Sequence, residues 1–219
     1  MRGAAVKYWG AGVTNKKTWS IPCFLLVFLP SLVWAGAIDD LKQFLNATKT
    51  LRAEFSQTVV GKSGRKPQQS FGVLSISRPG KLRWEIRQPY PQLMIGDGEK
   101  FWIYDQELAQ VTVRKASAAL GSTPAALLSG SNDLERNFSF RELVDSGGLS
   151  WLEAVPRNGE GGFETLRMGF SENLLKEMEL RDSFGQTTYL RFSAIERNAA
   201  FPSGYFVFVP PAGVDVLGE

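Results

Sequence analysis

Few side chains in this sequence are of the types that carry out chemistry. The 219 residues include no histidine, which removes the commonest general base, the usual catalytic triads and most zinc sites. The single cysteine, Cys23, excludes a disulfide within the chain. Acidic residues such as Glu142 and Asp145 read as solvated surface groups, and no phosphate-binding glycine motif or metal-ligand spacing is present. We therefore expect no catalytic residue, no metal, no cofactor and no enzymatic activity.

The polar residue that most needs an explanation is Arg78. It ends the run GVLSISR, in which alternate residues face one side of a strand, so strict alternation places Arg78 on the side of Leu74 and Ile76. An arginine among apolar side chains is costly unless its donors are paired. On the residues alone, the favoured interpretation is an arginine solvated at a strand end beside Pro79.

The chain around Arg78 reads mainly as strands. The run KLRWEIR, from Lys81 to Arg87, alternates strictly, with Leu82, Trp84 and Ile86 on one face. Asp97-Gly98 is a hairpin signal. Further runs of the same kind give about a dozen strands: RAEFSQTVV, SFGVLSIS, QPYPQLMIG, KFWIYDQ, AQVTVRK, FSFRELVDS, LSWLEAVP, ETLRMGFS, LLKEMELRD, TTYLRFSAIE and YFVFVPP.

A sheet of this size must curl, split into a sandwich or close into a barrel. A packed sandwich and a curled sheet around an apolar cavity both satisfy the alternating pattern. The few helices favour a loosely filled cavity, because the segment 116–132 has mostly small side chains, such as Ala125 and Ala126. That segment is either a plain loop or a loop carrying a short helix that starts at Thr123-Pro124. A second helix is predicted from Ile38, where Leu41, Phe44 and Leu45 follow at helical spacing.

The first 37 residues have a different character. Lys16 and Lys17 precede an apolar run from Ile21 to Ala37, which ends in Ala35-Gly36-Ala37. A basic N-terminal region, a short apolar region and small residues at the cleavage site are typical of a cleaved secretory signal peptide. A permanent membrane anchor is the alternative, although the run is short and contains two prolines. We expect residues 1–37 to be removed and residues 38–219 to form a single domain, in an exported compartment.

Removal of residues 1–37 changes the charge of the chain and its cysteine content. These residues hold four basic side chains and no acidic one, which leaves 21 basic and 22 acidic residues in the mature chain. The isoelectric point near 9.0 therefore belongs to the precursor and gives no reason to expect nucleic-acid binding. Cys23 would leave with the signal peptide, so the mature chain would carry no lipid-modified cysteine.

Several motifs occur in an order that resembles one bacterial family. The stretch SRPGKLRWEIRQPYPQLMIGDGEKFWIYD is similar to the R-P-x-x-x-x-W, Q-P and D-G-x-x-x-W-x-Y signature of the outer-membrane lipoprotein carrier family, LolA. GSTPAALL, FSAIE and FVFVPPAGVDV follow in the family's order, and DLKQFL with LRAEFSQ resembles its first helix and strand. The resemblance covers nearly all of residues 38–219.

The resemblance implies both a fold and a function. The fold is mainly β, an incompletely closed antiparallel barrel of about 11–12 strands with short lid helices over an apolar cavity. The function is that of a monomeric periplasmic chaperone, which takes lipoproteins from an inner-membrane ABC transporter and passes them to an outer-membrane lipoprotein acceptor. The family's lid-locking arginine matches Arg78, which implies that its five N–H donors bind carbonyls of the lid helices and loop. The expected lipid-binding cavity residues are Phe55, Leu74, Ile76, Leu82, Trp84, Ile86, Met94, Leu127 and Leu128.

Three other functions are weighed against the carrier. The acceptor has a similar fold but is itself a lipoprotein, and this chain lacks the needed cysteine. A periplasmic module that senses lipids or lipoproteins on this fold would carry an added domain, for which about 182 mature residues leave little room. An enzyme lacks support because histidine and a mature thiol are missing. One departure from the family concerns Ala125 and Ala126, which stand where relatives often have bulkier residues.

Overall fold

The computed structural model describes residues 36–62, 66–116, 124–129, 134–157 and 162–218, together with residues 1, 3–5 and 10. The predicted signal peptide therefore lies almost entirely outside the described residues. The described residues from Gly36 to Gly218 belong to one compact unit. Within the described ranges, no helix is both long enough and apolar enough to span a membrane.

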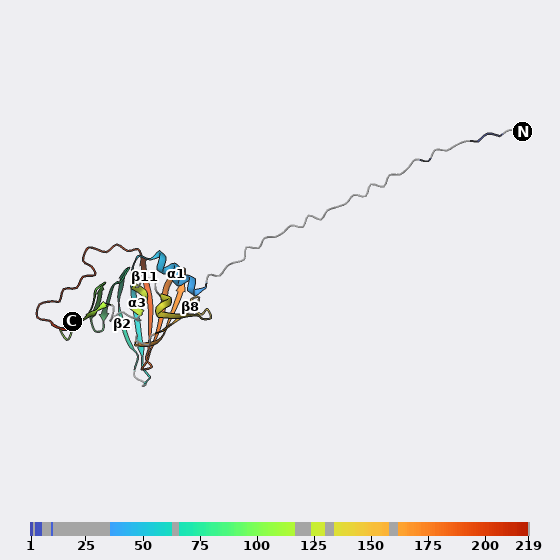
Figure 1. The fold of residues 1–219 in the computed structure, drawn as a ribbon. Coiled ribbons are helices and arrows are strands. Elements are labelled where there is room, and N and C mark those ends of the chain that lie inside the picture. Colours follow the sequence, from blue (N-terminus) through green and yellow to red (C-terminus); the bar gives the residue numbers. More distant parts are fainter. Residues whose placement is uncertain are drawn as a thin grey trace. The chain divides into compact units, whose positions relative to one another are not determined.

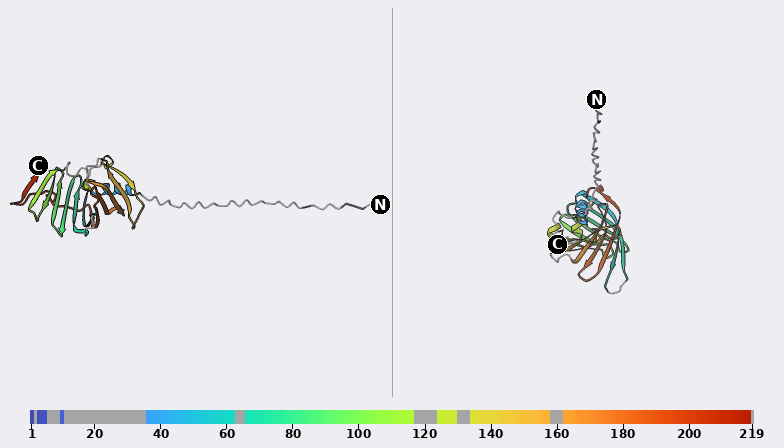
Figure 2. Two further views of the ribbon diagram at one scale, coloured as in Figure 1. Left: turned by 90° about the horizontal axis from the view of Figure 1, so that it is seen from below. Right: turned by 90° about the vertical axis from the view of Figure 1, so that its right-hand side faces the viewer.

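One curled sheet of twelve strands dominates this unit (Figures 1 and 2). Its order is β12-β6-β5-β4-β3-β2-β1-β11-β10-β9-β8-β7, so β12 and β7 are the two edges and the sheet stays open. Neighbours are antiparallel except β12, which runs parallel to β6. The fold is thus the incompletely closed barrel that the sequence predicts, and the packed sandwich is wrong. The strands are β1 (Thr50–Val60), β2 (Gln68–Ser77), β3 (Lys81–Gln88), β4 (Gln92–Asp97), β5 (Lys100–Asp105), β6 (Gln110–Lys115), β7 (Phe138–Glu142), β8 (Ser150–Pro156), β9 (Phe163–Ser171), β10 (Leu174–Asp182), β11 (Thr187–Arg197) and β12 (Asp215–Gly218).

The helices cover the inner face of the sheet. Helix α1 (Ala37–Ala47) packs on β7 to β10, and α3 (Pro124–Ser129) packs on β2 and β3, while α4 (Leu134–Asn137) leads into β7. The helix predicted from Ile38 is therefore present, and of the two alternatives for segment 116–132 the one with a short helix is correct. Figure 1 shows α1 at the end of the sheet opposite the β1–β2 hairpin, so the helices in the described part of the chain cover that end and not the hairpin end.

Helix α1 is held at both ends by side chains that are distant in sequence, one in β7 and one just after β11. At its start, Glu142 of β7 accepts a hydrogen bond from the Ile38 N–H at 3.2 Å, and a carboxylate is favoured at this end by the helix dipole. At its end, the Asn198 side chain donates to the Ala47 carbonyl at 3.1 Å and accepts from the Lys49 N–H at 2.9 Å. These contacts fix the helix against both halves of the sheet.

The outer face of β2 to β6 is covered by the C-terminal segment, which we define as residues 198–214. Trp102 and Tyr104 each lie 5.7 Å from the Phe208 ring, measured between ring centres. The Tyr205 hydroxyl lies 3.3 Å from the Ser75 hydroxyl. The segment shields apolar side chains that face away from the inner face, and it ends in β12 beside β6. The shielded side chains include Val73, Leu93, Ile95, Val111 and Val113.

One predicted strand is wrong. The run YFVFVPP, Tyr205 to Pro211, has strand-like composition but forms turns and irregular backbone. Its aromatic rings pack on the sheet face instead of extending the sheet, and its two prolines have no N–H to donate to a strand ladder.

Candidate functional site

The inner face of β1 to β5 carries cross-strand rows of apolar side chains. In one row, Leu74 of β2 pairs with Trp84 of β3, Trp84 with Met94 of β4, and Met94 with Ile103 of β5. In the neighbouring row, Ile76 pairs with Leu82. The structure therefore gathers the predicted cavity residues of three strands on one surface. We call this surface the apolar inner face; it consists of Phe55, Leu74, Ile76, Leu82, Trp84, Ile86, Met94 and Ile103.

Burial divides the apolar inner face into two parts. Leu74, Ile76 and Leu82 are fully buried near the helices, together with Leu127 and Leu128 of α3. Trp84, Ile86 and Met94 are only half-buried, although they pack against the same apolar cluster. Large apolar side chains on an inward face are normally buried completely. The half-buried set therefore marks where an apolar ligand could add to the core.

Phe55 joins the two parts. It is buried, and its ring lies 4.6 Å from the Trp84 ring between centres. Space for the ring comes from Gly72, which pairs with Phe55 across the strands. A Cβ atom at Gly72 would lie 2.7 Å from the Phe55 ring and closer still to the Glu85 carbonyl. A larger residue at position 72 would therefore displace Phe55 or the neighbouring strand.

Arg78 lies where α1, α3 and the end of β2 meet. Its Nε donates to the Leu128 carbonyl of α3 at 2.9 Å. Its Nη1 donates to the Leu45 carbonyl of α1 at 2.8 Å and to the Thr48 carbonyl just beyond α1 at 3.1 Å. The guanidinium carbon also lies 5.2 Å from the centre of the Phe44 ring. One side chain thus connects two helices to a strand end.

The helix ends explain why an arginine can occupy this position. The last carbonyls of a helix have no partner within the helix and carry a partial negative charge. Helix α1 has no basic residue in its last turn, so Arg78 supplies the cation from outside. Burial lowers the pKa of the Arg78 guanidinium to about 10, so the group remains charged near neutral pH. The solvated alternative for Arg78 does not fit these contacts.

Two buried polar atoms at this junction, Thr48 Oγ1 and Arg78 Nη2, have no hydrogen-bond partner among the described residues. On the apolar inner face, the buried Trp84 Nε1 has no such partner either. A buried polar atom without a partner costs free energy that a different arrangement can recover. The hydrogen-bonding groups at this junction are therefore not fully satisfied.

Comparison with known proteins identifies the family. Residues 46–209 match the family described as "Outer membrane lipoprotein carrier protein LolA". An outer-membrane lipoprotein carrier protein of Dechloromonas aromatica is 60% identical over 204 residues, which cover 93% of this chain and 97% of that protein. This chain belongs to the outer-membrane lipoprotein carrier family. A second carrier of this name, from Nitrosospira multiformis, is 48% identical over 90% of the chain and 97% of that protein.

A solved structure shares the carrier-family fold. An uncharacterized conserved protein of Thermus thermophilus superposes with a TM-score of 0.52, at 11% identity, over 82% of this chain and 95% of that protein. At this identity the likeness concerns the fold alone.

Other inner-face residues were missed by the sequence prediction for this carrier-family chain. Ile103 of β5, Phe140 of β7, Leu180 of β10 and Ile195 of β11 are also half-buried against the apolar cluster. Each lies in a run that alternates, so the signal was present, but alternation alone does not say which inward positions stay open. Ala125 and Ala126 lie in α3, and the packing of their side chains is outside what the structure describes.

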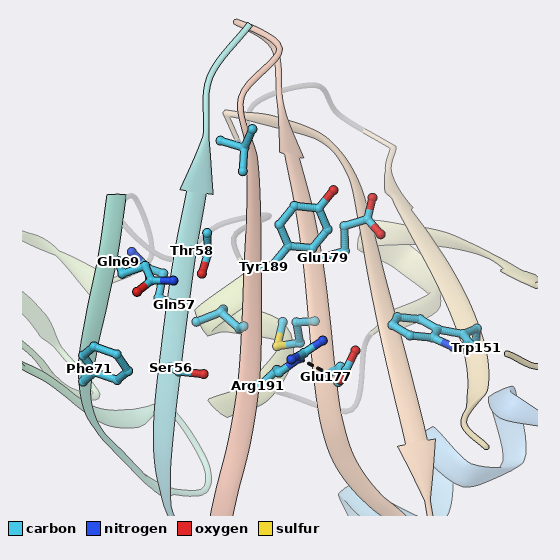
Figure 3. Close-up of a pocket in the computed structure, with 13 residues that line it drawn as sticks. Ser56, Gln57, Thr58, Gln69, Phe71, Trp151, Glu177, Glu179, Tyr189 and Arg191 are labelled. Atoms are coloured by element: carbon cyan, nitrogen blue, oxygen red, sulfur yellow. Dashed lines mark ion pairs between the residues drawn. The ribbon is translucent and has the colours of Figure 1, made fainter. Parts of the chain in front are cut away.

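A pocket of about 630 Å³ lies on the outer face (Figure 3). Its lining mixes apolar side chains such as Phe71 and Trp151 with charged ones, and an ion pair of 3.0 Å joins Arg191 to Glu177. Charged and polar side chains bind water well and acyl chains poorly. The residues that define the apolar inner face include no charged side chain, so this face suits acyl chains better than the mixed wall of the outer-face pocket.

Proposed function

We propose that this chain is a periplasmic lipoprotein carrier that holds the acyl chains of its cargo between the apolar inner face and the helices α1 and α3. Membership of the carrier family supports the function. The main support for this site is the half-buried part of the apolar inner face. It is continuous with the fully buried part, which lies beneath the helices that Arg78 holds.

In this proposal the helices form a lid. Entering acyl chains displace α1 and α3 from Leu74, Ile76 and Leu82 and break the bonds of Arg78. Each buried methylene contributes about 0.8 kcal/mol, which is opposed by the loss of charge-assisted hydrogen bonds of about 1.5–3 kcal/mol each. Cargo is then held with moderate affinity, so an acceptor that binds it more tightly can remove it.

The proposed partners follow from this role. The chain would receive lipoproteins from the inner-membrane ABC transporter that releases them, and would surrender them to an outer-membrane acceptor. It would work as a monomer in the periplasm after loss of residues 1–37, by binding alone and without catalysis. A lipid-sensing regulatory module on the same fold is not favoured, because the similar curated proteins are named as carriers.

The experiment has two steps. The mature protein is incubated with inner-membrane vesicles that contain transporter and newly made lipoprotein, and the soluble complex is then mixed with acceptor. We expect intact lipoprotein to appear in solution with this chain in a one-to-one complex and then to move to the acceptor. If the purified chain leaves lipoprotein in the vesicles under conditions where the relative from Dechloromonas aromatica releases it, the proposed function is wrong.

A further inference from the structure

A second pocket of about 370 Å³ opens at the end of the inner face that the helices leave uncovered. It lies where β1 ends, β2 begins and the turn after β3 leads into β4. Ile86 lines this pocket and also belongs to the apolar inner face, so the two surfaces are continuous. The lining residues are Gln57, Val59, Gln68, Gln69, Ser70, Ile86, Pro89, Tyr90, Pro91, Gln92 and Asp105.

Side-chain amides dominate the polar part of this lining. Gln57 lies two residues after Phe55 on the same side of β1, and Gln92 pairs with Ile86 across β4 and β3, so both glutamines adjoin the apolar inner face. Gln57 also lines the outer-face pocket (Figure 3). Both are half-buried, and neither makes a side-chain hydrogen bond within the described part of the chain. By contrast, Asp105 accepts hydrogen bonds from the Glu107 and Leu108 N–H groups, each at 3.0 Å. The pocket thus presents two half-buried, uncommitted amides, and two further glutamines of its lining, Gln68 and Gln69, are exposed.

The chemistry of these groups matches a polypeptide backbone. An amide side chain offers two N–H donors and a carbonyl acceptor, which complement the N–H and C=O of a peptide unit whatever its side chain. Tyr90 is 69% exposed and stands between Pro89 and Pro91 at the rim, where its ring can contact a passing chain. Among the described residues that line the pocket, none is basic, so a phosphate headgroup finds no matching charge.

Resting on the proposed function, we infer that this pocket binds the first residues of the cargo polypeptide, which follow the lipidated cysteine. The acyl chains lie on the apolar inner face, and the peptide leaves past Ile86 between Gln57 and Gln92. Recognition through backbone amides is independent of sequence, which suits a carrier that must accept different lipoproteins. The pocket would also fix the direction in which the folded part of the cargo projects, away from α1.

The test compares two ligands that differ only in the peptide. One is a diacylated cysteine amide, and the other is the same lipid on a neutral six-residue peptide. Affinities are measured by calorimetry for the wild type and for the double variant Gln57→Leu, Gln92→Leu. Gln43→Leu serves as the matched control, because Gln43 is exposed on α1 and does not line the pocket.

We expect the wild type and the Gln43→Leu control to bind the lipopeptide about tenfold more tightly than the lipid alone, as two added hydrogen bonds provide. The double variant should bind both ligands alike, with its affinity for the lipid alone equal to or above that of the wild type. Equal binding of the two ligands by the wild type would overturn this inference while leaving the carrier function intact. The same holds if the double variant keeps the preference for peptide. Failure of the wild type to bind either ligand would instead contradict the proposed function.

Discussion

Arg78 is the residue at which the proposed lid and the sheet are connected. Its guanidinium reaches the last turns of α1 and α3 at once, through the carbonyls of Leu45, Thr48 and Leu128. A lysine could supply the charge but not the planar fork that reaches several acceptors. The contacts therefore depend on the shape of the side chain as well as its charge. Substitution by lysine should weaken them in part, and substitution by leucine should remove them.

The first prediction concerns release of cargo. Arg78→Leu removes the bonds to both helices and adds apolar surface, which favours the open, loaded arrangement by roughly 2–5 kcal/mol before relaxation. The variant should take lipoprotein from vesicles as well as the wild type, but should pass less than about a tenth as much to the acceptor in the same time. Arg78→Lys should fall between the two proteins. Poor capture combined with normal transfer would instead place Arg78 at a docking surface.

The second prediction concerns the wall of the lipid site. Trp84→Glu places a carboxylate among Leu74, Phe55 and Met94, where acyl chains are expected to lie, and an unpaired charge is costly there. Capture of lipoprotein should fall at least about tenfold in a protein that is still exported. Tyr189→Glu is the matched control, because Tyr189 is 45% exposed on the outer face. Normal capture by a folded Trp84→Glu protein would show that this face is not the lipid site.

At the scale of elements, the alternation of apolar and polar residues predicted the inner face of the sheet. It did not predict which segment covers the outer face. Leu82, Trp84 and Ile86 alternate with charged residues, so their common face was readable from sequence alone. In β4 the residues Leu93, Met94 and Ile95 are all apolar, and only the tertiary structure shows that Leu93 and Ile95 lie beneath the C-terminal segment. Composition also failed for residues 205–211, because their packing onto the sheet overrides their strand propensity.

The contacts of Arg78 show the same limit. Strict alternation indicated on which side of the sheet Arg78 lies. The cost of burying an unpaired charge indicated that its guanidinium needs hydrogen-bond acceptors. Which carbonyls serve could not be derived, because α1, α3 and β2 are far apart in sequence. The pocket around Gln57 and Gln92 was equally hidden, since isolated glutamines carry no motif.

The third prediction concerns the acid stability of the outer face of β7 to β9. Burial raises the pKa of Glu153, but hydrogen bonds from Arg141 at 2.6 Å and Arg167 at 3.0 Å, together with their charges, outweigh this effect and leave the pKa of the carboxyl lowered. An acid with a lowered pKa stabilises the fold above its unfolded value of 4.5 and loses this contribution as the pH falls. Glu153→Gln should cost about 1–3 kcal/mol at neutral pH.

The measurement is denaturant unfolding of wild type and variant between about pH 5 and pH 3. The free energy of unfolding should fall less steeply with acid in Glu153→Gln than in the wild type. Glu164→Gln should keep the wild-type slope, because Glu164 is largely exposed and lies 3.4 Å from an exposed Arg181. Equal slopes in all three proteins would show that the Glu153 pair does not contribute to acid stability.

At the scale of the whole molecule, the carrier role requires release of the chain into the periplasm. We predict that signal peptidase cleaves after Ala37, because Ala35-Gly36-Ala37 matches the small-residue cleavage motif. The new amino group at Ile38 would then stand next to the Glu142 carboxylate, which already accepts from this nitrogen. N-terminal sequencing of the exported protein should give Ile38-Asp39-Asp40. Retention of residues 21–37 in the membrane fraction would contradict a freely moving carrier.

The central claim is that cargo acyl chains lie on the apolar inner face. Photo-crosslinking in living cells tests it most directly, with a photoreactive phenylalanine analogue placed one position at a time at Met94 and at Tyr189. These side chains lie on the inner and outer faces of the same sheet. We predict that the Met94 position forms adducts whose mass includes the lipidated N-terminus of a lipoprotein, and that the Tyr189 position does not. Lipid adducts at Tyr189 with none at Met94 would contradict the account.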